Sequence, residues 1–371
     1  MGESAVAKAL SFFLLIALGY LLKRKLAPEQ AKGLKTLILT VALPATIFLA
    51  LMQIRVSGDL LWIPLMALGG NILLYGLASL IGKRHTLGRD PVQRRTSQML
   101  FPSWAPGLSC FPFIAEFLGD ESLALAAIAD IGNKVFVLII LYLLAMRWLY
   151  HVQPGTDQNQ GGQRLRSLGL ALLKEPVNLA IVGALVLVSL GIHIENLPSF
   201  LQEGIGRLGI IMTPLVLLFI GLAVKLKREQ VWPILSLLLM RSGAGLCLSG
   251  VCLLILPGLS PSAALILVIF PQSACSFWPF AHMSAVEAQR QGELPIFDLE
   301  LGVNILAFSL PFSTVVILGL ALAGDTLTFP PVLFLLGIAL FFLGVLPSLF
   351  KRFSKNVPNT TKVAAINGET Q

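Results

Sequence analysis

Runs of apolar residues, each about as long as a bilayer-spanning helix, recur from one end of the chain to the other. A helix needs about 20 mainly apolar residues to cross the hydrocarbon core of a bilayer. Polar and charged residues gather in the short stretches between these runs, so the pattern predicts an all-α integral membrane protein. We expect eleven spans, at residues 5–22, 34–52, 60–82, 97–118, 122–148, 175–193, 205–224, 231–255, 263–285, 301–323 and 329–350.

The fourth and ninth expected spans contain prolines that interrupt a helix. Proline lacks the backbone N–H of the helical ladder, and glycine adds no side chain to stiffen the break. The first interruption falls within residues 101–113 and the second within residues 270–280. Unpaired backbone groups are costly in hydrocarbon, so such breaks persist only against protein or a water-filled cavity. The residues we expect to break these helices are Pro102, Pro106, Gly107, Pro112, Pro271 and Pro279.

Landmarks of the first half of the chain recur about 170 residues later, which indicates an internal repeat. The matched pairs are Pro44 with Pro214, Pro112 with Pro279, and Asn133 with Asn304. Pro44 and Pro214 are also expected to break the helices in which they lie. Each half holds five expected spans, an odd number, so the second copy enters from the opposite side of the membrane and the repeat is inverted. Broken helices in corresponding positions of two halves indicate the binding site of a secondary transporter.

A polar, low-complexity stretch at residues 154–162 separates the two halves. We therefore expect a first five-helix repeat at residues 1–150, a cytoplasmic linker at 151–174, a second, inverted repeat at 175–323, and an extra transmembrane helix with a cytoplasmic tail at 324–371. Of the 27 Lys and Arg residues, 22 fall on one side of this topology. Because basic residues concentrate on the cytoplasmic side, we expect a multi-pass protein of the cell (plasma or inner) membrane, with its N-terminus outside and its C-terminus in the cytoplasm.

Composition supports the same class. Of the 371 residues, 56% are hydrophobic and 12% are charged, against about 25% charged in ordinary soluble domains. The mean hydropathy is +0.84. The net charge of +8 does not indicate a nucleic-acid partner, because the basic residues flank apolar segments and form no separate basic domain. The first apolar run follows no strongly basic region, so we expect it to be a retained span and not a cleaved signal.

Cysteine and histidine usage argues against an enzyme, a metal site or a cofactor. All four cysteines (Cys110, Cys247, Cys252 and Cys275) fall within apolar segments and lack the paired spacing of a disulfide framework or metal site. The four histidines (His85, His151, His193 and His282) are expected at span ends or in loops, so no nucleophile and base meet at membrane depth. The chain also lacks a phosphate-binding Gly-Lys-Ser/Thr loop, so we expect ion gradients or the membrane potential to drive its activity.

Several short motifs resemble the auxin efflux carrier family of permeases, whose bacterial members resemble malate and malonate permeases. The motifs are ALPATIF at residues 42–48, GDESLALAAIADIGN at 119–133, LKEP at 173–176 and PLVLL at 214–218. The resemblance covers about residues 5–322 and implies a ten-helix core of two inverted five-helix repeats. It implies that broken helices 4 and 9 cross at mid-membrane and that a small carboxylate or other organic anion binds beside the crossing. The chain differs from the family at Ser103–Gly107 and Lys134, and its eleventh span is extra.

Asp130, Asn133 and Lys134 lie near the middle of the fifth expected span, on one helical face. Ionisable groups at that depth are costly and usually mark a substrate or ion path. We interpret Lys134 as the fixed positive charge for an anionic substrate, Asn133 as an amide partner of that substrate, and Asp130 as a carrier of a proton or cation. The alternative is that Asp130 and Lys134 only neutralise each other.

Polar residues of the tenth span and of the interruptions are further candidates. Asn304 is a candidate for substrate binding and Glu300 for ion or proton coupling, although Glu300 can instead belong to the preceding cytoplasmic loop. At the interruptions, Ser103, Gln272 and Ser273 are candidates for substrate binding. The alternative for the serines is a bond to the preceding helical turn.

Three other polar or aromatic positions have a favoured structural interpretation. We expect Arg241, midway along the eighth span, to be a cation paired with a helix end or carbonyls, with an anion ligand as the alternative. Asn71 is expected to make an interhelical hydrogen bond. Trp104 and Trp278 are expected to pack beside the interruptions, with a platform for a substrate ring as the alternative.

Together these features predict a secondary active transporter, a permease or efflux carrier, that moves small organic anions by alternating access. The alternative within transport is a sodium-coupled symporter of the bile-acid type, and outside transport it is a membrane sensor or scaffold. The expected partners are the organic anion, the lipid bilayer and H+ or Na+ as the coupling ion, with a homodimer left open and no nucleic acid.

Overall fold

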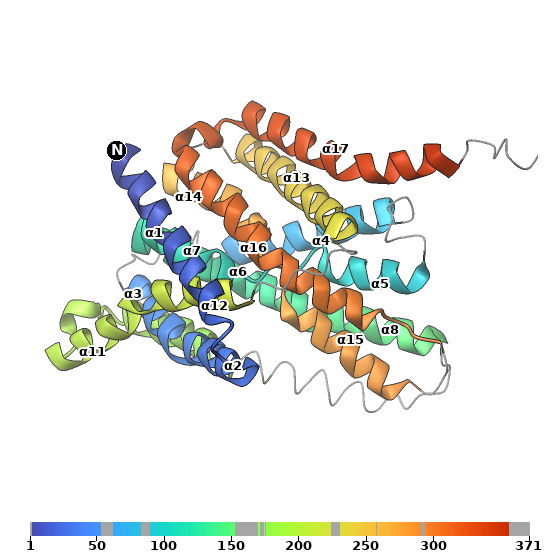
Figure 1. Cartoon of the computed structure of the whole chain (residues 1–371). Coiled ribbons are helices and arrows are strands. Elements are labelled where there is room, and N and C mark those ends of the chain that lie inside the picture. Colours follow the sequence, from blue (N-terminus) through green and yellow to red (C-terminus); the bar gives the residue numbers. More distant parts are fainter. Residues whose placement is uncertain are drawn as a thin grey trace, which may run out of the picture.

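The computed structural model describes residues 2–52, 62–82, 90–152, 170, 174, 176–223, 231–256, 258–290 and 294–355 (Figure 1). Every regular element within these residues is helical, which confirms the all-α prediction. By length and composition, seven helices in the described residues can cross a membrane. They are Glu29–Met52, Trp62–Gly82, Phe111–Val152, Ser199–Leu222, Val231–Ile255, Pro261–Gln289 and Leu299–Ala323. Shorter apolar helices are Leu10–Leu22, Pro176–Ser189 and Pro330–Leu346.

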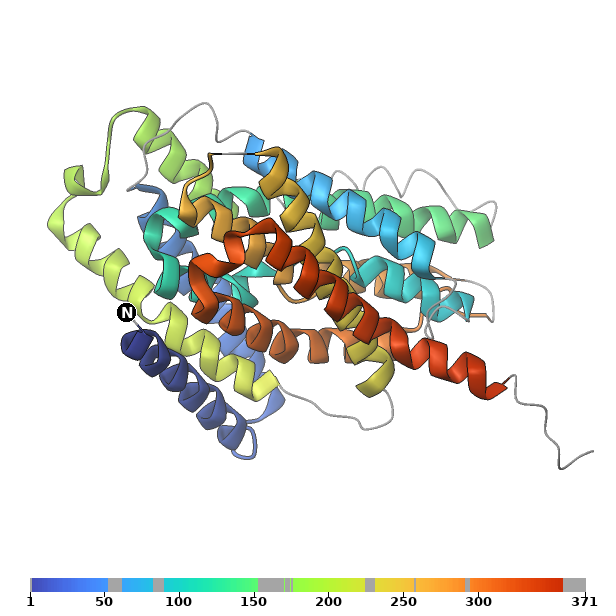
Figure 2. The same ribbon diagram turned by 90° about the horizontal axis from the view of Figure 1, so that it is seen from above.

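A first helix group lies toward the left of Figure 1, where α1 packs along α12 and α10 packs along α3. Figure 2, seen from above, also places α1 (dark blue) beside α12 (yellow-green). Its members are α1 (Gly2–Leu22), α2 (Pro28–Leu37), a π-helical turn (Ile38–Ala42), α3 (Leu43–Met52), α10 (Pro176–Ser189), a 3-10 turn (Ile194–Asn196), α11 (Ser199–Ile210) and α12 (Met212–Ala223).

The remaining helices form a second helix group, in which α4 packs on α7, α15 on α8, and α17 along α13. The first group meets it through α3 and α12, which both contact α7. The second group comprises α4 (Trp62–Gly82), α5 (Pro91–Leu100), α6 (Pro106–Ser109), α7 (Phe111–Val135), a π-helical turn (Phe136–Ile140), α8 (Leu141–Val152), α13 (Val231–Ile255), α14 (Pro261–Ile269), 3-10 turns (Phe270–Gln272 and Gly324–Thr328), α15 (Phe277–Gln289), α16 (Leu299–Ala323) and α17 (Pro330–Lys355).

Both interruptions predicted from the prolines are present. After α5 ends at Leu100, the chain leaves the helix until Pro106, the first residue of the one-turn α6, and Pro112 is the second residue of α7. The second interruption lies between the 3-10 turn that contains Pro271 and the start of α15, whose third residue is Pro279. These four prolines therefore occupy first turns, where their missing N–H leaves no helical bond unmade.

The other two predicted helix breakers also mark irregular backbone. Before Pro44, the π-helical turn Ile38–Ala42 ends with the Leu43 N–H donating to the carbonyl of Ile38, one residue further back than in an α-helix. Pro214 follows the point at which α11 ends and α12 begins, at Ile211. At Gly119, between the fourth and fifth expected spans, a kink with φ of 83° requires a residue without a side chain.

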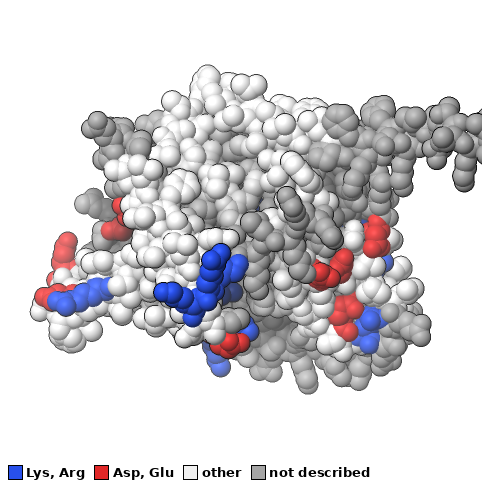
Figure 3. All heavy atoms as spheres, in the orientation of Figure 1, with Lys and Arg blue, Asp and Glu red and all other residues white. Residues whose placement is uncertain are grey.

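Charged side chains are confined to parts of the surface. On the face drawn in Figure 3, the Lys, Arg, Asp and Glu of the described residues gather in the lower half and at the two ends, and the described atoms of the upper part are almost entirely uncharged. Large apolar side chains such as Leu80, Leu335 and Trp62 are exposed. An exposed apolar belt is the surface expected of a protein in lipid. The predicted linker at 151–174 lies largely outside the described residues. Of the predicted extra helix and tail at 324–371, residues 324–355 are described.

Candidate functional site

The two interruptions lie directly against each other in the interior. The backbone N–H of Ala105 donates to the carbonyl of Ala274 at 2.8 Å. The N–H of Ser276 donates to Ser103 Oγ at 3.1 Å, and that of Ala274 donates to Ser109 Oγ at 2.9 Å. These bonds satisfy backbone groups that the broken helices leave without helical partners, as irregular backbone at membrane depth requires. The serines of the first interruption therefore hold the second one in place.

Arg241, from α13, holds the first interruption from another side. Its Nε donates to the carbonyl of Phe101 at 2.8 Å, and its Nη2 donates to the carbonyl of Ser103 at 2.7 Å. The side chain is buried, and it forms no ion pair within the described residues. The carbonyls at the end of α5 lack helical donors, which the guanidinium supplies. The predicted pairing of Arg241 with carbonyls is confirmed.

The side-chain amide of Asn133 satisfies the backbone N–H and carbonyl of Trp104, in the first interruption. Its Nδ2 donates to the carbonyl of Trp104 at 2.9 Å, and its Oδ1 accepts from the N–H of Trp104 at 3.3 Å. Asn71 Nδ2 donates to the carbonyl of Pro102 at 2.6 Å and to Asn133 Oδ1 at 3.2 Å, which confirms the predicted interhelical bond of Asn71. Near this interruption, Asn71 Oδ1 and Trp104 Nε1 are buried and have no hydrogen-bond partner among the described residues.

Close packing brings α4 onto this part of α7. A Cβ built on Gly132 would lie 1.8 Å from the carbonyl oxygen of Pro64, so only glycine permits the approach. Gly132 directly precedes Asn133, and this approach carries Asn71 of α4 to the amide of Asn133.

Gln272 and Ser273 are both occupied within the protein. Gln272 Oε1 accepts from Ser242 Oγ at 2.6 Å, and Gln272 Nε2 donates to the carbonyl of Ser242 at 3.3 Å, so the second interruption is bound to α13. Ser273 Oγ donates to the carbonyl of Phe270 at 2.6 Å, and Ser103 Oγ donates to that of Leu100 at 2.8 Å. Both serines thus bond the preceding turn, the alternative that the sequence left open, and Ser103 also accepts from the second interruption.

Lys134 lies between two acceptors at the boundary of the two helix groups. Its Nζ is 3.3 Å from Asp130 Oδ2 and donates to Asn178 Oδ1, on α10, at 2.9 Å. Asp130 Oδ1 accepts from Asn133 Nδ2 at 2.8 Å, so the predicted polar face of α7 is one connected network. Asp130 is 4% exposed and Lys134 is 7% exposed. Burial strengthens the interaction of such an ammonium with any nearby negative charge.

The two remaining candidates, Glu300 and Asn304, lie in the first turns of α16. Glu300 is an exposed residue in the first turn of α16, which is the loop-end position left open by the sequence. Asn304, one turn further on, is buried.

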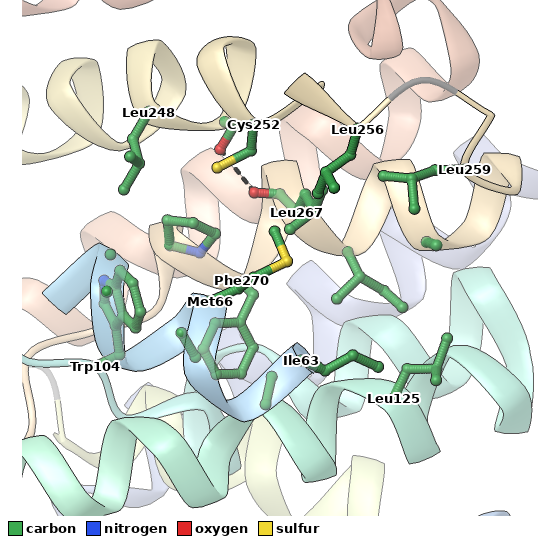
Figure 4. Close-up of a pocket in the computed structure, with 18 of the residues that line it drawn as sticks. Ile63, Met66, Trp104, Leu125, Leu248, Cys252, Leu256, Leu259, Leu267 and Phe270 are labelled. Atoms are coloured by element: carbon green, nitrogen blue, oxygen red, sulfur yellow. Dashed lines mark hydrogen bonds between the residues drawn. The ribbon is translucent and has the colours of Figure 1, made fainter. Parts of the chain in front are cut away.

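A cavity of about 280 Å³ adjoins both interruptions, between α4, α7, α13 and α14 (Figure 4). Trp104 from the first interruption and Phe270 from the second form part of its wall, with their rings edge to face and 5.5 Å between centroids. Trp104 therefore packs beside the interruption, as predicted. The cavity is lined by Ile63, Met66, Ala67, Gly69, Gly70, Leu73, Trp104, Leu125, Ala129, Leu248, Ser249, Cys252, Leu256, Leu259, Ala263, Ile266, Leu267, Phe270 and Pro271.

Three features of the site escaped the sequence analysis. Asn178 follows the LKEP motif but lies 44 residues from Lys134, and no pattern pairs the two. Lys35 is one of the 22 basic residues expected on the cytoplasmic side, yet its Nζ lies 5.1 Å from the ring centroid of Phe277 at the start of α15. The expected position of His282 at a span end is wrong. Because α15 continues to Gln289, His282 is buried and its Nε2 lies 3.0 Å from the carbonyl oxygen of Val137.

The described residues contain no group of three His, Cys, Asp or Glu side chains that could hold a metal ion.

No family model matches the chain. It is 24% identical over 233 residues to an uncharacterized transporter of Methanocaldococcus jannaschii, a match that covers 60% of this chain and 71% of the relative. It is 26% identical over 223 residues to an uncharacterized transporter of Methanothermobacter thermautotrophicus, covering 59% of this chain and 67% of the relative. These relatives and the multi-span helical structure support a membrane transporter. The names of these two relatives give no substrate.

Proposed function

We propose that the chain is a secondary active transporter of small organic anions that works by alternating access, similar to the auxin efflux carrier permeases. The observation that carries this proposal is the charge balance of the interior. Among the described residues, the buried Asp, Glu, Lys and Arg side chains are Asp130, Lys134 and Arg241, two cations and one carboxylate. Asp130 pairs with Lys134, whereas Arg241 is bonded to neutral carbonyls. The interior beside the interruptions thus has a positive charge in excess.

An excess buried cation favours an anion as the mobile species. A charge in a medium of low dielectric constant interacts strongly with an opposite charge, and charged groups inside membrane proteins usually mark a transport path. Lys134 is the better contact for the substrate, because its ammonium lies where the two helix groups meet and can be reached when they move apart. Arg241 contributes to the same positive potential while it holds the first interruption.

The excess positive charge also suggests roles in transport for the remaining candidate residues. Asn133, Ser103, Gln272 and Ser273 shape the surroundings of the interruptions, and Asn304 is a further candidate for substrate binding. Asp130 is the carboxylate that a coupling proton or cation would occupy. Glu300 is the second candidate for coupling.

The proposed topology is an inverted repeat with the N-terminus outside and the C-terminus in the cytoplasm of the cell membrane. The order of elements supports it, because a long helix, an interrupted helix and another long helix follow one another in each half. Cysteine labelling tests it at positions 57 and 158, which lie outside the described residues. We expect position 57 to react from outside and position 158 only from inside, and labelling of both from one side contradicts the repeat.

Transport itself is tested with purified protein in sealed lipid vesicles. Labelled malate and malonate are offered outside, with a proton gradient, a sodium gradient or a membrane potential imposed separately, and protein-free vesicles serve as the control. We expect uptake of at least one dicarboxylate above the control under one of these gradients. A strict requirement for sodium would favour the sodium-coupled symporter. The absence of uptake and of counterflow for every tested carboxylate would reject the proposal.

A further inference from the structure

The cavity between α4, α7, α13 and α14 has an apolar interior although it adjoins the interruptions. Among the described residues, those that line it include no Lys, Arg, Asp or Glu. Its one hydroxyl group belongs to Ser249, which donates to the carbonyls of Leu267 at 2.6 Å and Gly245 at 2.9 Å and has no further proton to give. The dashed line in Figure 4 marks the bond to Leu267. An apolar cavity of this kind offers water no partners, and it does not suit the carboxylate of a substrate.

The mouth of the cavity faces the bilayer interior. Leu73 lines the cavity, is 62% exposed, and lies near the middle of α4, a helix of 21 residues. An exposed apolar side chain at mid-span contacts lipid hydrocarbon and not water. The opposite wall is formed by Trp104, which is 2% exposed, and by Phe270. The cavity therefore extends from the lipid-facing surface to the aromatic pair that joins the two interruptions.

The geometry points to a membrane-lipid acyl chain as the occupant of this cavity. A void inside a protein forfeits dispersion contacts on its lining, and acyl chains are the apolar molecules that surround the mouth. A chain that enters past Leu73 contacts the rings of Trp104 and Phe270. The acyl chain thereby supports the packing of the two interruptions from the side opposite Lys134. It takes no part in anion binding. This site differs from the proposed anion site in ligand, in lining residues and in route of entry.

Fluorescence quenching by brominated lipid tests the occupancy. The protein is reconstituted in phosphatidylcholine with or without bromine atoms on its acyl chains, and the Trp emission of the wild type is compared with that of Trp104→Phe. The difference isolates the emission of Trp104. Because Trp104 is buried, it is quenched by contact only when a chain enters the cavity. We expect brominated lipid to quench the emission of Trp104, which is the wild-type emission minus that of Trp104→Phe. If the emission of Trp104 is equally intense in brominated and unbrominated lipid, the proposal is overturned.

A pair of glycine variants supplies a matched control that retains Trp104. Neither Gly69 nor Gly76 of α4 has an atom within 4 Å of a Cβ built on it, but only Gly69 lines the cavity. Gly69→Leu should fill the cavity and reduce the quenching of total Trp emission, whereas Gly76→Leu should not. Equal quenching in the two variants overturns the proposal, even where Trp104→Phe fails to fold. If added malate or malonate restores the emission quenched by brominated lipid, the cavity binds a substrate, and the proposal of a lipid occupant is overturned.

Discussion

Lys134 Nζ and Asn178 Oδ1, 2.9 Å apart, join α7 of the second helix group to α10 of the first. The amide oxygen of Asn178 is a neutral acceptor, and an ammonium makes a stronger hydrogen bond to a carboxylate. A carboxylate that reaches Lys134 therefore competes with a contact between the two helix groups. Binding that replaces such a contact changes the relative stability of the arrangements of the two groups, which is the physical requirement for coupling binding to movement.

Asn178→Asp should weaken anion binding, because it places a second carboxylate on Lys134 that the substrate must displace. A hydrogen bond to a charged group contributes about 1.5 kcal/mol or more, so we expect the apparent KM for dicarboxylate uptake to rise by about tenfold or more. The matched control is Val177→Ala, a buried neighbour in the same turn of α10, which should leave KM unchanged. A KM in Asn178→Asp equal to that of the wild type contradicts this role of Lys134.

The double variant Asp130→Asn with Lys134→Gln separates a substrate contact from a structural ion pair. Both charges are removed together, so neither remains buried without its partner, and replaced buried pairs are often tolerated. We expect the variant to insert and fold but to lose anion binding by roughly 2 kcal/mol or more, as for the loss of a charge-assisted hydrogen bond. Uptake is measured in vesicles, and insertion is checked separately by protein recovery and thermal unfolding. Near-normal uptake would show that the two residues are only an ion pair.

The parts of the fold and site that could be predicted from sequence are those set by local chemistry. Proline cannot donate a helical hydrogen bond, so Pro102, Pro106 and Pro271 marked the interruptions directly. The spacing of Asp130 and Lys134 by one helical turn likewise predicted their contact.

The remaining contacts depend on which helices pack together. Asn178 is one amide in an apolar helix, and its partner is determined by the packing of α10 near α7. His282 was misplaced because α15 continues beyond the apolar run, through Glu287 to Gln289. The cavity was also not predictable, since it results from the way that four helices fail to fill the space between them.

A disulfide between positions 105 and 274 should form within one chain. The backbone N–H of Ala105 donates to the carbonyl of Ala274, and neighbours bonded in this way have Cα atoms within the roughly 7 Å that a disulfide allows. Ala105→Cys and Ala274→Cys are combined after replacement of the four native cysteines by Ala. A protease site in the linker at residues 154–162 then shows by gel electrophoresis whether the two halves are joined. The two single-cysteine variants are the controls, and halves that separate under oxidising conditions contradict the contact between the interruptions.

Removal of the Arg241 guanidinium should destabilise the first interruption. In Arg241→Met, the carbonyls of Phe101 and Ser103 lose donors that are 2.8 and 2.7 Å away in a dry interior. An unpaired buried polar group costs about 1–3 kcal/mol, so we expect a clear fall in the midpoint of thermal unfolding in detergent. Arg207→Met is the matched control. Its side chain is 81% exposed and paired with Glu203, and surface pairs of this kind contribute only about 0–1 kcal/mol.

Arg241→Lys separates the charge of Arg241 from its geometry. The lysine keeps the positive charge that favours an anion, but an ammonium cannot reproduce the planar fork that reaches both carbonyls. We therefore expect Arg241→Lys to unfold at a lower temperature than the wild type, while the inserted protein retains more dicarboxylate uptake than Arg241→Met. Thermal unfolding and vesicle uptake, both normalised to folded protein, check these two expectations. If Arg241→Met matches Arg207→Met in thermal stability, the guanidinium does not hold the interruption. If Arg241→Lys and Arg241→Met transport equally well, the charge of Arg241 does not contribute to the potential that attracts the anion.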